Sequence, residues 1–398
     1  MVKQILIGVF CAVIFSVALA VTGLFNVHII AYALAGWTVL CLFLKRNHAL
    51  YITGSVAVIM CLAWVGVTAS GVAEENATTP EEYLTEYNPK LAFYTFTPNR
   101  QVEMEQQGGV LSRIDTSVEP VAREIVFSTD KNGLRNTDDV DSPEVLLIGG
   151  AFIAGSGNTQ SALISEQLKT KYNIAAYNVA TCGSLDEQAL LALTLVQEQP
   201  LVKKGILFVF EGDDFDPFTT EVHYPFKRAV NFLGNNELAR FLREYSNRFA
   251  PTKVEQARVT RFALGSKDLA FSEAYVEEAT AVEYAVDPKF EELLASLSDS
   301  AKLVQAVVFI PTKYRVYAPL LGDNAPALPE SPKLDALRTI AANHSFAVYD
   351  LTPHLQAKAI TQWGEKKELL WWSDDVYWNA SGSEVAAELV KEIVRGNL

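Results

Sequence analysis

The chain has 398 residues, which is more than one ordinary domain, and 49% of them are hydrophobic. Its 47 Asp and Glu outnumber its 33 Lys and Arg, and the formal net charge of −14 argues against nucleic acid and anionic lipid as partners. Three of the four cysteines, Cys11, Cys41 and Cys61, lie in apolar stretches near the N-terminus. Cys182 is alone in the remaining chain, so no intrachain disulfide is expected there.

The first 70 residues contain no Asp or Glu and hold three apolar spans, Ile5–Phe25, Ile29–Leu44 and Tyr51–Ser70. Each span is about the length that crosses a hydrocarbon core of roughly 30 Å, although the second is short. A cleaved signal peptide is the alternative for the first span, but two more spans follow at once and would still hold the protein in a membrane. We therefore expect residues 1–70 to form three transmembrane helices.

The few positive charges near these spans indicate their orientation. Lys3 precedes the first span, Lys45 and Arg46 lie between the second and third, and the turn at 26–28 has neither Lys nor Arg. The positive-inside rule then places the N-terminus in the cytoplasm and everything after Ser70 outside it.

The outer part begins with a linker. Residues 71–86 are polar and acidic with one proline, and this composition is typical of a connecting segment. We expect the outer domain to cover residues 87–398, starting with short strands and turns over 87–142. Without the three basic residues of the membrane region, the outer part has 30 Lys and Arg against 47 Asp and Glu, or about −17.

From Glu144 onward, apolar runs alternate with amphipathic segments. The runs read "VLLIG", "IAAYNVA", "GILFVFE", "AVVFIP" and "FAVYDL". Their continuous apolar character suits strands that are buried on both faces of a parallel sheet. The helical segments are Ser161–Lys171, Asp186–Glu198, Pro332–Asn343 and Ser381–Arg395. This alternation predicts a doubly wound α/β domain, in which sites form at the carboxyl ends of the strands. An insertion of about residues 214–303 adds predicted helices at 229–249 and 288–297.

Four segments fall at predicted strand ends or near the chain end: "GGAFIAGSG", "YNVATCGSLDEQ", "VFEGDDFD" and "SDDVYWNASG". Together with "FIPTKYRVYAP" and "VYDLTPHLQA" they resemble, in order and spacing, the SGNH/GDSL-type esterase superfamily. The nearest likeness is to membrane-anchored bacterial members related to alginate and cell-wall O-acetyltransferases, and "STDKNGLRN" resembles their lead-in segment. The resemblance runs from about Tyr87 to the C-terminus and implies a three-layer α/β/α domain.

The resemblance also implies which positions once carried chemistry. The family's nucleophilic Ser falls at Ala151, after Gly150, and the glycine of its oxyanion hole falls at Gly183. Its Asn side-chain donor falls at Asp213. In the last segment, residues 373–382, which we call the C-terminal block, the family's His falls at Tyr377. The other family positions keep their residue types, namely Asp374, Asp375, Asn379 and Gly382.

These replacements remove what acyl transfer needs. Ala151 has no hydroxyl to attack an ester, and Tyr377, with an ordinary pKa near 10, is a poor base at neutral pH. Asp213 accepts hydrogen bonds and donates none when ionised, so it would repel an oxyanion. We therefore expect no catalytic residue at this site and no cofactor.

Other uses of the site remain open. A relocated nucleophile could come from Cys182, Ser184 or Ser156, but each would need a base, and the outer domain offers only three histidines. These are His223, His344 and His354.

Two weaker possibilities concern ligands. Asp213, Asp214 and Asp216 are weak candidates for a divalent cation, although the alternating side chains of a strand cannot all converge and a solvated acidic loop is the simpler interpretation. Trp372, Trp378 and Asn379 could bind a sugar by stacking and hydrogen bonding, while ordinary aromatic packing is the alternative.

The resemblance then implies a role. We expect a catalytically inactive, SGNH-like protein of the bacterial inner membrane with a periplasmic domain, acting as a binding or structural subunit of an envelope complex. The implied context is the assembly or acylation of a surface polysaccharide, with a glycan or other envelope membrane proteins as partners besides the lipid bilayer. The alternatives are an active esterase or O-acyltransferase with relocated residues, and a structural subunit of an unrelated membrane complex.

Overall fold

The computed structural model describes residues 79–88, 93–198, 204–215, 258–323 and 325–396. Among these residues, no helix is both long and apolar enough to cross a membrane. The three predicted spans, most of the predicted linker and the predicted helix at 229–249 lie outside the described residues, as do Asp216 and His223.

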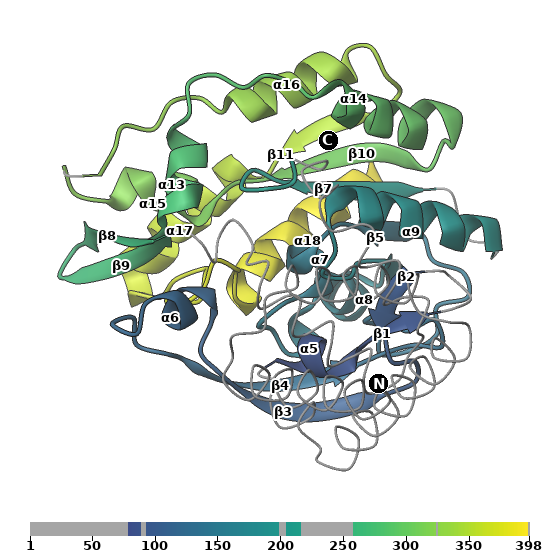
Figure 1. Ribbon diagram of the computed structural model, residues 1–398, viewed down its shortest axis with the longest axis horizontal. Coiled ribbons are helices and arrows are strands. Elements are labelled where there is room, and N and C mark those ends of the chain that lie inside the picture. The colour runs from purple at the N-terminus through teal and green to yellow at the C-terminus, as the bar shows by residue number, and fades with distance from the viewer. Residues whose placement is uncertain (1–78, 89–92, 199–203, 216–257, 324, 397–398) are drawn as a thin grey trace, which may run out of the picture. The chain divides into compact units, whose positions relative to one another are not determined.

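The centre of the domain is a five-stranded parallel sheet (Figure 1). Its strands in chain order are β5 (Val145–Ile148), β6 (Ala176–Asn178), β7 (Gly205–Phe210), β10 (Val304–Ile310) and β11 (Ala347–Asp350). They lie side by side in the order β11-β10-β7-β5-β6. The three central strands are almost fully buried, which explains their continuous apolar runs. The predicted parallel α/β architecture is confirmed.

Helices cover both faces of this sheet and make three layers (Figure 1). One face packs on α8 (Ile164–Tyr172), α17 (Thr352–Lys366) and α18 (Ala380–Arg395), and the other on α9 (Leu185–Glu198), α14 (Pro288–Ala295) and α16 (Pro332–Ala341). Side chains of β7 alternate between the two cores: Ile206 and Phe208 enter the first, and Leu207 and Val209 the second.

Local sequence signals explain where these helices begin and end. Ser331 and Asp287 cap α16 and α14 through their side chains, and each cap is followed by a proline in the first turn. Asn379 caps α18 by accepting hydrogen bonds from the backbone of Ser381 and Gly382. The helix therefore starts just before the predicted Ser381.

Smaller elements flank the sheet. Before it come α5 (Pro80–Leu84), β1 (Thr85–Asn88), β2 (Phe93–Phe96), β3 (Gln101–Gln107), α6 (Val110–Ile114) and β4 (Ala122–Ser128). Residues 80–86 belong to this folded part, although the sequence assigns them to the linker. Leu84 explains the difference, because it is buried with Phe96, Ile125 and Phe127 in a third small core. The β1–β2 and β3–β4 pairs are antiparallel hairpins.

The insertion contributes a further hairpin, β8 (Val259–Leu264) with β9 (Lys267–Ser272), then α13 (Glu273–Thr280) and α14. Helix α14 confirms the helix expected at 288–297. After β10 comes the short helix α15 (Lys313–Tyr317), and after β5 the short helix α7 (Ala151–Ala154).

The strand order positions the site. The chain leaves β5 toward β6 on one side, whereas β7 pairs with β5 on the other side. In doubly wound sheets, the crevice at such a switch point, outside the carboxyl ends of the strands, is the usual place for a ligand. Here it lies between the residues that follow β5 and those that follow β7.

Candidate functional site

The segments singled out in the sequence meet at this edge of the sheet. A Cβ atom at Gly150 would lie 3.6 Å from the carbonyl oxygen of Gly183, so the loops after β5 and β6 are neighbours. The ring of Phe152 in α7 lies 5.1 Å from that of Tyr377, centroid to centroid, which brings the C-terminal block to the same place. The ring of Phe210 at the end of β7 lies 4.7 Å from Phe152 on another side.

The turn that presents Ala151 is held by a buried arginine. Arg135 donates from Nη1 to the carbonyls of Ala154 (3.0 Å) and Gly155 (2.8 Å), at the end of α7. Its guanidinium also lies 4.0 Å from the centroid of the Phe127 ring, and burial lowers its pKa to about 10. Gly155 is required because its φ is +81°. Arg135 therefore holds the C-terminal end of the short helix that begins at Ala151.

Asp213, after β7, is exposed and accepts a hydrogen bond from the hydroxyl of Tyr275 at 3.0 Å. Burial raises the pKa of Tyr275 well above its usual value, and the charge of Asp213 raises it further. Asp214 next to it turns back and accepts from the backbone N–H of Phe210 at 2.7 Å. Burial, followed by repulsion from Asp213, raises the pKa of Asp214 to about 8.

Tyr377 occupies the predicted base position and is half-buried. Burial raises its pKa well above the usual value, and nearby charges, first of all that of Asp213, raise it further. The hydroxyl is therefore neutral at physiological pH, and the phenolate that could accept a proton is even less populated than in an ordinary tyrosine.

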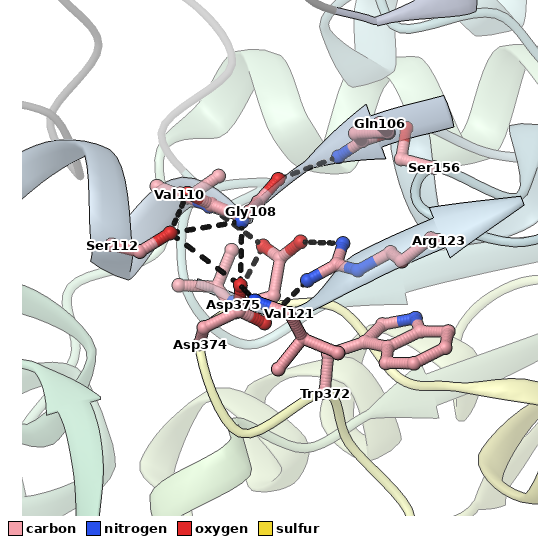
Figure 2. A network of polar contacts seen from close by, with 12 residues as sticks. Gln106, Gly108, Val110, Ser112, Val121, Arg123, Ser156, Trp372, Asp374 and Asp375 are labelled. Carbon is pink, nitrogen blue, oxygen red and sulfur yellow. Dashed lines mark hydrogen bonds and ion pairs between the residues drawn. The ribbon is translucent and has the colours of Figure 1, made fainter. Parts of the chain in front are cut away.

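The two aspartates of the C-terminal block are fully engaged (Figure 2). Arg123 of β4 forms buried ion pairs with both, to Asp374 through Nη2 and to Asp375 through Nη1 at 2.7 Å. The backbone N–H groups of Gly109 and Val121 donate to Asp374 at 2.9 and 2.8 Å. A side chain at Gly109 would collide with the carboxylate of Asp375.

Asp375 has backbone donors as well, from Val110 at 3.2 Å and Val376 at 2.8 Å. The two carboxylates thus anchor the segment from β3 to β4 on the C-terminal block, and the side chain of Asp375 already accepts three hydrogen bonds. An acid in this position would have to orient a base, and Asp375 instead serves as an attachment point for Arg123.

Lys313, in the first turn of α15, supports the C-terminal block from the other side. Its Nζ donates to the carbonyls of Trp372 (3.0 Å), Ser373 (3.1 Å) and Asp375 (3.1 Å). The side chain is buried, and this lowers its pKa to about 7 in spite of the attraction of Asp375 and Asp374.

The three residues predicted to bind a sugar have different surroundings. Trp378 is 1% exposed and packs in the core against Phe152. Asn379 uses its side chain to cap α18 and to donate to the carbonyl of Leu369. Trp372 is half-buried, and the guanidinium of Arg123 stacks on its ring at 4.5 Å. Only Trp372 of the three has both an exposed surface and a ring that is not part of the core.

Cys182 and Ser156 lie together, with 3.6 Å between Sγ and Oγ. Cys182 has an exposed surface. Even so, desolvation of its thiol by the surrounding protein, followed by the charge of Glu81, raises the pKa of the thiol to about 12. Of the two histidines that the structure describes, His344 pairs with Asp299 at 2.7 Å and His354 is exposed on α17.

The acidic residues after β7 do not gather around a cation in the described part of the chain. Glu211 is buried and binds Arg315 at 2.7 Å, while Ser331 and Thr312 donate to the same carboxylate. No group of three or more His, Cys, Asp or Glu suited to a metal ion occurs among the described residues.

Sequence reasoning missed the charged residues that hold the site. Arg123, Arg135 and Lys313 are each at most 5% exposed, but nothing in their local sequence distinguishes them from surface residues. The one available signal is the position of Arg135 in "NGLRN", inside the lead-in segment of the family resemblance. For Arg123 and Lys313, the partners lie about 250 and 60 residues away along the chain, so spacing gives no sign.

Comparisons with family models, with curated proteins and with solved structures found no match for this chain. The interpretation of the site therefore depends on its own geometry and on the residues quoted above.

Proposed function

We propose that this protein is a catalytically inactive, SGNH-like binding or structural subunit of a bacterial envelope complex, anchored in the inner membrane with its α/β domain in the periplasm. One observation carries the proposal: Ala151, Asp213 and Tyr377 gather at the switch point of the sheet, where an esterase would need a nucleophile, a donor and a base. Phe152 contacts Tyr377, and the charge of Asp213 acts on Tyr377 more strongly than any other.

Each replacement acts against acyl transfer for its own reason. Ala151 cannot form a covalent acyl intermediate, and loss of a nucleophile or base costs far more than loss of one oxyanion donor, which is about 10²–10³ in rate. Tyr377 stays protonated at neutral pH. Asp213 brings a negative charge to the place where negative charge would have to develop. Asp375 is bound to Arg123 and not to a base.

The rival, an esterase with relocated residues, would use Ser156 or Cys182, because these two lie beside Gly183 and contact each other. A thiol with a pKa of about 12 holds almost no thiolate at neutral pH. Among the described residues, His344 is paired with Asp299 instead, and His354 is exposed on another helix. These observations favour the inactive form.

The membrane and glycan parts of the proposal rest on the sequence. Three apolar spans exceed what a simple tether needs, which points to contacts with other membrane proteins, such as an acyltransferase. The family resemblance points to a surface polysaccharide, and the partly exposed Trp372 could contact it. The second candidate is a structural subunit of a membrane complex unrelated to glycans. Co-purification of a stable partner that has no carbohydrate chemistry would favour it.

The test is the hydrolysis of p-nitrophenyl acetate by the full chain in mild detergent, beside the variants Cys182→Ala and Ser156→Ala. We expect all three proteins to match the buffer background. Turnover above background that disappears in either variant would identify a relocated nucleophile and contradict the proposal. Turnover that survives in both variants would contradict it as well, with the nucleophile elsewhere.

A further inference from the structure

We propose that the protein binds the acetamido group of an N-acetylated sugar beside Trp372, just before the C-terminal block. The inference rests on the proposed non-catalytic function, with a glycan as ligand, and names the group that is recognised. It follows from four polar atoms, which we call the Trp372 set: Arg123 Nε, Trp372 Nε1, Gln106 Oε1 and Asn158 Oδ1. All four are buried, and none has a hydrogen-bond partner in the part of the chain that the structure describes.

The atoms of this set come from segments that meet at the β3–β4 hairpin. Gln106 and Arg123 are direct partners across the hairpin, so their side chains lie on the same face (Figure 2). The guanidinium of Arg123 stacks on the ring of Trp372 at 4.5 Å. A Cβ built at Gly157, next to Asn158, would lie 2.7 Å from Arg123 Nη1 and 3.5 Å from Trp372 Nε1. The lack of a side chain at Gly157 therefore lets this loop approach both donors closely.

Two members of the set are hydrogen-bond acceptors. Gln106 donates from Nε2 to the carbonyl of Gly108 at 3.0 Å, and Asn158 donates from Nδ2 to the carbonyl of Trp378 at 2.9 Å. These bonds fix the orientation of both side-chain amides, because only the nitrogen can donate to a carbonyl. The remaining atom of each amide is therefore the oxygen, which can accept.

The other two members are donors. Arg123 uses its two terminal nitrogens for Asp374 and Asp375, which leaves the Nε–H. The indole N–H of Trp372 can only donate. Arg123, Gln106 and Asn158 are each at most 4% exposed. Buried polar atoms without partners are costly, so a group that pairs with all four gains from each of them.

A secondary amide matches this pattern of donors and acceptors. Its carbonyl oxygen has two lone pairs for the N–H groups of Arg123 and Trp372, and its N–H can donate to Gln106. A hydroxyl on the neighbouring carbon of the sugar can donate to Asn158. A carboxylate would leave the two acceptors unpaired, and an ammonium group would leave the two donors unpaired. The charge of Arg123 is also balanced by two carboxylates, so an anion gains little there.

The ring of Trp372 favours a sugar over a peptide as the carrier of the amide. Trp372 is half-buried and lies at the outer side of the set, whereas Arg123 and Gln106 are buried. A pyranose has a flat face of C–H groups that can pack on the exposed part of the indole, and an aromatic surface with a few placed polar groups is typical of a ligand site. No hydrogen bond from a described residue holds the indole N–H, so the ring can move aside to admit the group.

The test compares two neutral probes that differ at one carbon of each sugar: the trimer of β-1,4-linked N-acetylglucosamine and the trimer of β-1,4-linked glucose. N-acetylalanine methylamide is the third probe and carries secondary amides without a sugar. Binding to the full chain in mild detergent is measured by isothermal titration calorimetry. Trp372→Phe keeps a ring for Arg123 and removes the N–H donor.

Trp363→Phe is the matched control, because Trp363 on α17 is also half-buried and also contacts a cation, Lys367, at 5.3 Å. Thermal unfolding of both variants checks that the fold is kept. We expect the acetylated trimer to bind at least about tenfold more tightly than the glucose trimer, and Trp372→Phe to lose about tenfold in affinity for it, as for one hydrogen bond. Trp363→Phe should bind like the wild type.

Four results would overturn the inference. Equal binding of the two trimers would mean that the acetamido group is not recognised, and binding of neither would leave water as the partner of the Trp372 set. Normal binding by Trp372→Phe would place the sugar elsewhere, and binding of N-acetylalanine methylamide as tight as that of the acetylated trimer would assign the site to a peptide. None of these results bears on ester hydrolysis, so the absence of catalysis is tested separately.

Discussion

Arg123 and Asp375 form a buried ion pair, with 2.7 Å between Nη1 and Oδ2, and join β4 to a block some 250 residues later in the chain. The same guanidinium reaches Asp374 with its other terminal nitrogen. Two adjacent carboxylates in the interior are stable only with such partners, because each isolated buried charge is costly. The block that could have carried an acid and a base is thereby turned into an anchor for the β3–β4 hairpin.

Removing the guanidinium should therefore destabilise the domain strongly. Arg123→Met leaves two buried carboxylates without their guanidinium partner, held by hydrogen bonds from backbone N–H groups and the Ser112 hydroxyl, and breaking a buried pair in this way costs about 3–5 kcal/mol. The free energy of unfolding in urea measures the loss. Arg261→Met, which breaks the half-exposed pair with Asp115, is the control and should lose much less. Equal losses in the two variants would show that Arg123 has no special role.

Cys182 should be slow to react despite its exposed surface. With a pKa of about 12, roughly 10⁻⁴ of the thiol is ionised at pH 8, compared with about a quarter for an ordinary cysteine. Alkylation by iodoacetamide at pH 8 should therefore be about 10³-fold slower than that of free cysteine. Peptide mass spectrometry of the full chain separates Cys182 from the other three cysteines. Rapid alkylation would mean an activated thiol and would favour the relocated nucleophile.

Asp214 should make stability fall as the pH rises. Its pKa is raised to about 8, from about 3.8 in the unfolded chain, so the folded state binds the extra proton between these values. The stabilisation is complete below pH 4 and is lost as the pH rises through 8. Asp214→Asn keeps an acceptor for Phe210 and removes the titrating group. The free energy of unfolding of Asp214→Asn minus that of the wild type should therefore increase from pH 4 to pH 8.

Asp335→Asn, on the surface of α16, controls for the loss of one negative charge. If the difference between Asp214→Asn and the wild type stayed constant over this pH range, Asp214 would not be the group that titrates. If Asp335→Asn gave the same trend, the net charge of the domain would explain it instead.

The sheet could be predicted because its strands are continuous apolar runs in the sequence. Runs such as "GILFVF" in β7 are apolar throughout, since both faces of the strand are covered by helices. Ala151 and Asp213 could be predicted to lie close together because parallel strands end at one edge, whereas Tyr377 follows no strand and its place was implied only by the family resemblance. What stayed hidden depends on long-range geometry: Arg123 and Lys313 acquire their roles only when segments far apart in sequence pack together. Residues 80–86 look like a linker because α5 is short and acidic, yet the buried Leu84 and the partly buried Tyr83 pack them against a small core of the domain.

Lys313 gives the opposite pH dependence to Asp214. Burial lowers its pKa from about 10.5 to about 7, so between these values the unfolded chain binds the proton and the folded protein does not. Its contribution to stability is complete above pH 10.5 and is lost as the pH falls to 7. Lys313→Met fills the same space without a titrating group, but it leaves the three carbonyls of Trp372, Ser373 and Asp375 without their donor.

Lys313→Met should therefore be less stable than the wild type, and the deficit should widen as the pH rises from 7 to 10.5, because only the wild type gains over that range. Urea unfolding of both proteins at several pH values gives the two curves. A deficit that narrows with rising pH would mean that the charged form is the one the fold stabilises. In that case the attraction of Asp374 and Asp375 would outweigh the burial of Lys313, and the C-terminal block would be held by an ion triad with Arg123.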